Sequence, residues 1–178
     1  NTTKSISNDI FFGSIFAEAT SDANSAGISM TVGVDYIPFE AEFDSRSTTQ
    51  SSLKAKADGA ATSGTNKGTA DVSGHTTLYI EPAKELDNGL TVFARAGIMR
   101  ADVDILVQSV SSTNKTVSET LEGTQIGIGV KKDMGAGFMK LSYTESDYDA
   151  LSVTTSNNTK VTGDIDNSAF NLSFGKSF

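Results

Sequence analysis

Apolar and polar residues alternate with a period of two along most of the chain. The clearest stretch is the C-terminus, where Phe170, Leu172, Phe174 and Phe178 share one parity, and Asn171, Ser173, Gly175 and Ser177 share the other. The same alternation covers 28–36, 78–83, 90–98, 124–131 and 139–144. The segment 9–20 is rich in β-forming residues but alternates less cleanly. A period of two is typical of strands with one apolar face, so the pattern predicts seven strands.

The connections between these strands are of two kinds. Short segments at 21–27, 87–89 and 133–137 carry Gly, Asn and Asp, which suit the positive φ angles of tight turns. Between them lie polar Ser/Thr-rich stretches at about 45–74, 108–119 and 154–164, which we expect to be long loops, mobile and solvated. The sequence predicts one domain over 1–178, with its turns at one end and its loops at the other.

The polar faces of the predicted strands indicate what lies on each side of the sheet. They are crowded with Gly, Ser and Thr and carry charges of both signs, on Glu18, Asp35, Glu81, Arg95, Lys131 and Lys140. Small residues and pairable charges suit the interior of a narrow barrel, whereas the aliphatic and aromatic faces suit lipid. We therefore expect an antiparallel up-and-down β-barrel whose lumen is filled by a polar and ionic network. A soluble, lipocalin-like barrel, with its apolar face inside, is the alternative.

The composition excludes several kinds of site. Across 178 residues there are no cysteines and 14 basic against 22 acidic residues, a net charge of −8. Disulfides and cysteine-bound metals are impossible, and the acidic balance disfavours nucleic acid as a partner. The sequence contains no run of 18 apolar residues, so no transmembrane helix is predicted. His75 is the only histidine, and we expect a rim residue there. Neither catalytic residues nor a cofactor are predicted, so an enzyme is not expected.

Acidic residues alternate on the predicted strand extension that holds Glu145, Asp147 and Asp149. Carboxylate oxygens are the ligands of Ca²⁺ and Mg²⁺, so these three residues are candidate ligands for divalent cations. Such ions would bridge an anionic surface to lipopolysaccharide. The alternative is a solvated acidic rim that keeps the loops soluble.

The C-terminal strand resembles the terminal signature of Gram-negative outer-membrane barrels. Phe178 closes the chain, and Phe170, Leu172 and Phe174 precede it at alternate positions, whereas Lys176 departs from the usual aromatic or aliphatic residue. The whole chain resembles the small OmpA/OmpX/opacity-protein type of barrel, which normally has eight strands. The resemblance implies a place in the bacterial outer membrane at the cell surface, contacts with lipid and lipopolysaccharide, and recognition of the last strand by the barrel-assembly machinery.

An eight-stranded barrel requires one strand more than the seven that the pattern predicts. Tracing the turns back from the C-terminus places the start of the first predicted strand at the loop end, so we expect the missing first strand N-terminal to Asn1. A neighbouring chain that adds its own strand at the open edge is the alternative. The expected role is structural or surface-interactive, with acidic external loops. A small porin-like diffusion channel and a subunit of a strand-exchanging surface assembly are the other functions considered.

Overall fold

The computed structural model describes the chain except for residues 1–10, 40, 55–60, 110–111, 155–159 and 178. The strands are β1 (Ile15–Thr20), β2 (Ile28–Ile37), β3 (Ala41–Lys54), β4 (Ala61–Glu85), β5 (Leu90–Ser109), β6 (Ser112–Asp133), β7 (Gly137–Thr154) and β8 (Lys160–Lys176). All the regular structure in the described residues is β, and they contain no helix long and apolar enough to cross a membrane.

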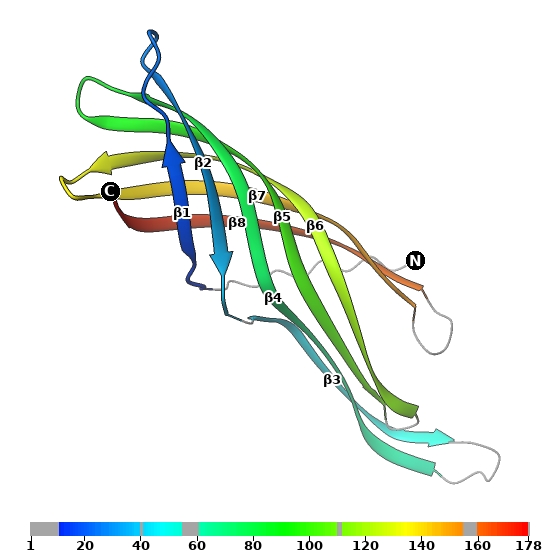
Figure 1. Ribbon diagram of the computed structural model, residues 1–178. Helices are drawn as coiled ribbons and strands as arrows, with labels where there is room; N and C mark the ends of the chain where they lie inside the picture. Colours follow the sequence, from blue (N-terminus) through cyan, green and yellow to red (C-terminus); the bar gives the residue numbers. More distant parts are fainter. Residues whose placement is uncertain (1–10, 40, 55–60, 110–111, 155–159, 178) are drawn as a thin grey trace.

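The strands form one antiparallel sheet that curls into a half-barrel (Figure 1). Its order is β1-β2-β4-β5-β6-β7-β8, and β3 pairs with the other half of the long strand β4. Thus β2 and β3 lie one after the other along β4, with the break beginning at Pro38, which has no N–H to donate. Seven strands therefore cross the body of the sheet, which confirms the predicted number. In the described part of the chain, β1 and β8 are the two unpaired edges of this body, and β3 is an edge strand beside the loop-end part of β4.

Three short turns join strands at the end of the sheet where the chain also ends (Figure 1). We call this the turn end, and the opposite end the loop end. Gly27, Gly89 and Gly135 have φ of 72°, 74° and 80°, which L side chains rarely adopt. The Gly27 and Gly89 amides donate to the carbonyls of Asn24 and Leu86, each at 2.9 Å. The three predicted turns are confirmed.

The segments expected to be loops are mostly strands, so this part of the prediction is wrong. Instead of a loop over 45–74, β3 pairs with 61–72 of β4. Pairing of β5 with β6 continues to Ser109 and Ser112, and pairing of β7 with β8 continues to Thr154 and Lys160. Backbone pairing needs no apolar face, and Thr and Val favour it, so a search for apolar alternation misses these extensions. The tips at 55–60, 110–111 and 155–159 lie outside the described residues.

The first predicted strand also starts later than expected. Within the predicted range 9–20, β1 begins only at Ile15, and 11–14 are not paired in the sheet. Gly13 interrupts the apolar pattern in this segment, which fits its weaker alternation. The prediction for residues 9 and 10 lies outside the described residues.

The two faces of the sheet separate apolar from polar side chains as predicted. One face carries a belt of exposed apolar side chains, which we call the apolar band: Ile28, Met30, Val32, Val34, Tyr36, Leu78, Ile80, Val92, Ile98, Ile126, Ile128, Val130, Leu141, Phe170, Leu172 and Phe174. Side chains of the other face meet one another across the curl, so this face is the concave one. The sheet is thus apolar outside and polar inside.

Candidate functional site: the ionic cluster of the concave face

Four charged residues meet on the concave face and form what we call the ionic cluster. Lys140 of β7 donates through Nζ to Glu81 Oε2 at 2.7 Å and to Glu18 Oε2 at 2.9 Å. Arg95 of β5 donates through Nε to Glu81 Oε1 at 2.8 Å, and its second nitrogen lies 2.6 Å from the same oxygen. Two carboxylates and two cations from β1, β4, β5 and β7 therefore neutralise one another.

An aromatic ring lies beneath the cations of this cluster. The guanidinium carbon of Arg95 lies 3.8 Å from the centre of the Tyr79 ring, and the Tyr79 hydroxyl donates to Glu18 Oε2 at 3.2 Å. Stacking and hydrogen bonding both hold the charges in place. Tyr79, Glu81 and Lys140 are only 1%, 2% and 3% exposed. Buried charges of this kind are tolerated because each one has partners.

Three large aromatic side chains of the concave face lie over glycines on neighbouring strands. Tyr79 pairs in register with Gly33, Phe93 with Gly129, and Phe138 with Gly175. A Cβ added at any of these three glycines would lie 2.2–2.4 Å from an atom of the partner ring. Such approaches are closer than packed atoms allow, so each ring occupies the space that glycine leaves. These three aromatic–glycine pairs explain why glycine stands at three positions of the polar faces.

Toward the loop end, the concave face becomes apolar. Met99, Ala101, Val103 and Leu121 are buried there at 1–6% exposure. His75 and Tyr148 lie beside this group, with ring centres 6.1 Å apart in an edge-to-face arrangement. Both lie beyond the apolar band. Burial lowers the pKa of His75, although the nearby Asp35 carboxylate partly opposes the shift, and burial raises the pKa of Tyr148 to about 12.

Four of the six residues predicted for the lumen network form the ionic cluster. The other two also belong to the concave face but lie apart from it. Lys131 lies nearer the turn end, 3.7 Å from Asp133 and 4.6 Å from the centre of the Phe138 ring. Asp35 lies nearer the loop end with Ser14 as its hydrogen-bond partner, and no ion pair of the described residues includes it.

Sequence reasoning missed the aromatic half of the site. Tyr79, Phe93 and Phe138 belong to the polar parity of their strands, where apolar residues are not expected. The signal that could have found them is the presence of single glycines at the same parity on neighbouring strands. Without the register between strands, no ring could be matched to its glycine.

The structure places the remaining predicted residues on the outer face. Glu145, Asp147 and Asp149 alternate there along β7 and are exposed, and Tyr143 donates to Glu145 at 3.1 Å. No three acidic or histidine side chains in the described residues are arranged to hold a metal ion. Phe170, Leu172 and Phe174 point outward from β8 and are 60–82% exposed. Phe178 lies outside the described residues.

The cluster is built to hold strands together, since all its charged groups are engaged with one another. Toward the turn end it borders an open cavity of about 260 Å³ whose lining includes Glu18, Glu81, Phe93, Lys131 and Asp133. Water and small ions can enter such a cavity from the turn end, but the ionic cluster and the rings of Tyr79 and Phe93 lie at its inner side.

Comparison with known proteins adds no identification. No family model, curated protein or solved structure matches the chain. The function must therefore be argued from the sheet and its two faces.

Proposed function

We propose that this protein is a small outer-membrane β-barrel of Gram-negative bacteria whose role is structural or surface-interactive. In this proposal the apolar band contacts lipid and the ionic cluster fills the lumen. The strand extensions at the loop end project from the cell surface, and the turn end faces the periplasm. No catalytic step is assigned to it.

The observation that carries the proposal is the inverted distribution of polarity in the sheet. Ile128 and Phe174, in the middle and near the end of the band, are 66% and 64% exposed, whereas Glu81 and Lys140 are almost completely buried. In water this arrangement would leave a large apolar surface exposed and would bury charges for no gain. In a bilayer the apolar belt contacts acyl chains and the interior charges are shielded from them.

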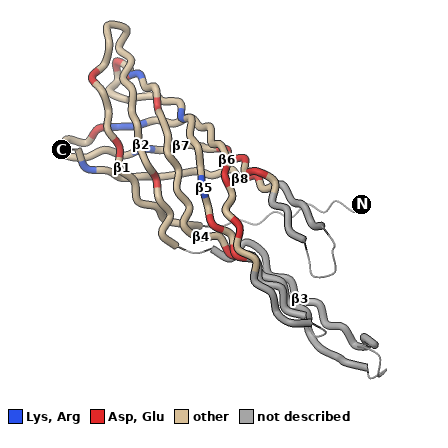
Figure 2. Tube along the Cα trace, turned by 45° about the vertical axis from the view of Figure 1, so that its right-hand side comes forward, with Lys and Arg blue, Asp and Glu red and all other residues tan. Residues whose placement is uncertain are grey.

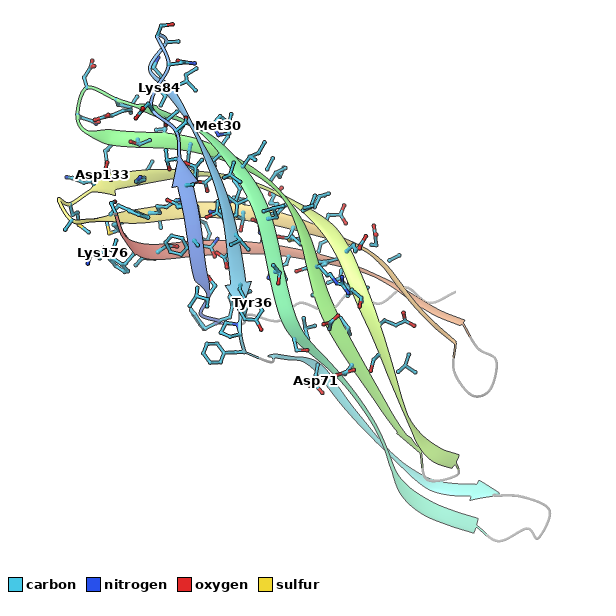
Figure 3. All side chains as sticks on the ribbon, in the orientation of Figure 1. Met30, Tyr36, Asp71, Lys84, Asp133 and Lys176 are labelled. Atoms are coloured by element: carbon cyan, nitrogen blue, oxygen red, sulfur yellow. The ribbon has the colours of Figure 1, made fainter. Side chains whose placement is uncertain are left out.

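The charges at the two ends of the outer face support the same orientation. Lys84, Lys132 and Lys176 lie at its turn end (Figure 3 labels Lys84 and Lys176), where long side chains can reach lipid headgroups. Acidic residues gather where the strands leave the band for their extensions (Figure 2). We propose that divalent cations near Glu145, Asp147 and Asp149 link this acidic rim to lipopolysaccharide. This link is loose and electrostatic, without a built metal site.

Closure of the barrel is part of the proposal. β1 leads into a turn at the turn end, and β8 also ends there, because the Ser177 amide donates to the Ala136 carbonyl of the β6–β7 turn at 3.2 Å. The two edges therefore run in the same direction, so one strand antiparallel to both can join them. We propose an eight-stranded barrel whose first strand is a segment of the same polypeptide before Asn1, assembled with the help of the C-terminal strand.

A diffusion channel is the second candidate, and the turn-end cavity is the observation in its favour. Against it, the pairs among Glu18, Glu81, Arg95 and Lys140 would have to separate before the cavity could connect to the loop end. We therefore expect no steady conductance in a planar bilayer. Stepwise conductance that rises in the Arg95→Ala variant, but is absent from the wild type, would agree with a closed lumen. Steady conductance of the wild type would favour the channel.

The test of the proposal is fractionation of cells that produce the native protein, with intact mass and N-terminal sequence of the recovered chain. We expect the protein in the outer-membrane fraction, with one alternating strand before Asn1. Recovery from a soluble or filamentous fraction would contradict the lipid-facing barrel. Recovery from the outer membrane of a chain that starts at Asn1 would contradict only the proposed source of the closing strand, and would favour a strand-exchanging assembly.

A further inference from the structure

Side chains from β1 and β7 already occupy the space in front of the open seam between β1 and β8. The rings of Phe16 on β1 and Phe138 on β7 have their centres 6.1 Å apart, and Lys140 Nζ lies 2.9 Å from Glu18 Oε2. β8 lies between β7 and the seam. Whatever strand fills the seam must therefore fit behind these four side chains.

The inner face of β8 shows what this position demands of a strand. Behind the apolar band its inward residues are short, Ala169, Asn171, Ser173 and Gly175, whereas nearer the loop end the same parity includes Ile165. At Gly175 an added Cβ would lie 2.2 Å from Cζ of Phe138. The ring of Phe138 covers β8 closely enough that only glycine fits beneath it.

Phe16 differs in one respect from Tyr79, Phe93 and Phe138, the other inward aromatic residues behind the apolar band. Tyr79, Phe93 and Phe138 each lie over a glycine of a paired strand. The partner of Phe16 on β2 is Asp35, and the ring of Phe16 instead approaches Phe138 across the seam. A glycine beneath the ring of Phe16 would therefore have to lie on the strand that closes the seam between β1 and β8.

We propose that the strand closing the sheet between β1 and β8 carries glycine at the position paired with Phe16. Its other inward positions carry Gly, Ala or Ser, and its outward positions carry apolar residues that continue the band. It runs from the turn end to the loop end, antiparallel to both edges. This inference rests on the proposed eight-stranded closure and specifies which strands can complete it.

The experiment adds designed strands directly before Asn1 of the full chain, which is then refolded into phosphatidylcholine vesicles. The first strand has apolar outward residues, Ser and Ala inward, and Gly opposite Phe16. The matched control differs only in carrying Leu in place of that Gly. Both are also made with Phe16→Ala, which removes the ring that would clash with Leu. Hydrogen exchange of the β1 and β8 amides is the readout, because pairing at the seam protects amides that now face an open edge.

We expect the Gly strand to slow exchange at the seam amides of β1 and β8 by roughly tenfold or more relative to the chain without it, and the Leu strand to give little protection. Phe16→Ala should restore protection by the Leu strand. Equal protection by both strands in the presence of Phe16 would overturn the glycine requirement and leave eight-stranded closure intact. Failure of all four designs to protect either edge would overturn the closure itself, and with it this part of the proposed function.

Discussion

The sheet has two regions, the part that carries the apolar band and the strand extensions at the loop end, which we call the extension. Where single strands pass from one region to the other, the outer and inner faces exchange their polarity. On β5 the outward residues change from Val92 and Ile98 in the band to Arg100 and Asp102 in the extension. The inward residues change from Arg95 to Met99, Ala101 and Val103, without any change of parity. At the level of the apolar band the sheet is apolar outside and charged inside, whereas the extension is charged outside and apolar inside.

β4 makes the same exchange with the help of a β-bulge. Its pairing with β5 shifts between Ser73 and Thr76, where Gly74 has φ of 61°. The extra residue lets β4 keep apolar Val72 on the inner side of the extension, opposite Val103. The difference between the two regions shows that the polarity of a face is not fixed along a strand, and in the proposed membrane placement it follows the surrounding medium. The exchange marks the level at which lipid would give way to water.

The largest expected effect comes from breaking the ionic cluster, which lies on the concave face behind the apolar band. Lys140→Met leaves Glu18 without its cation and Glu81 with Arg95 alone, in a site where Lys140 is 3% exposed. Removing one partner of a buried charge pair costs about 3–5 kcal/mol, so we expect the free energy of unfolding to fall by that amount. Urea unfolding of the protein refolded in vesicles measures it.

Lys131→Met is the matched control for Lys140→Met. Lys131 is also an inward lysine, but its side chain is 22% exposed and its partner Asp133 is 67% exposed. Exposed pairs contribute about 0–1 kcal/mol, so little change is expected. Equal losses for the two variants would show that the cluster is no more protected from water than the turn end.

The second prediction compares the stability cost of an added charge in the apolar band with the cost of one on the outer face of the extension. Ile128→Lys places a charge in the middle of the band and should cost about 2–4 kcal/mol in vesicles. Thr120→Lys, on the outer face of the same strand beyond the band, should cost less than about 0.5 kcal/mol, as exposed substitutions in water usually do. Urea midpoints of both variants in vesicles provide the comparison. If Ile128→Lys is as harmless as Thr120→Lys, the band does not contact lipid.

The third effect concerns the apolar inner side of the extension. Leu121→Ala removes a side chain that is 6% exposed and should cost about 2 kcal/mol, the low end for a buried leucine, since the opposite face of the strand is open to water. The loss should be local, so hydrogen exchange should speed up at 117–123 and leave the band unchanged. Glu122→Ala, outward on the same strand, is the control and should change little. Faster exchange throughout the band would mean that the two regions open together.

Sequence reasoning recovered the band and missed most of the extension for one physical reason. Alternation identified strands only where apolar residues such as Ile128 and Leu172 face outward, and it stopped where Arg100 and Asp102 took those places. The inward run of Met99, Ala101 and Val103 keeps the same parity and could have extended the strand. The ionic cluster was predictable as a set of inward charges. Its pairings were not, because they depend on the curl that brings β1 and β7 together.

The smallest effect is a pH dependence at His75, which lies just beyond the apolar band, where the extension begins. Burial lowers its pKa from 6.5, and its Nδ1 is buried without a hydrogen-bond partner. Above about pH 7.5 the side chain is almost entirely neutral in both folded and unfolded chains and adds almost no slope. As the pH falls below 6.5, the unfolded chain takes up the proton more readily, so the folded state loses stability.

His75→Gln removes this titration, so the stability of the wild type relative to the variant should be nearly constant between about pH 8.5 and pH 7.5 and should decline toward about pH 5.5. Urea unfolding at these pH values measures the difference, and carboxylates shared by both proteins cancel from it. The opposite trend, with the wild type gaining relative stability on acidification, would mean that the Asp35 carboxylate outweighs burial. His75 would then be a charged residue at the start of the extension, and the inner side of the extension would be wetter than its apolar residues indicate.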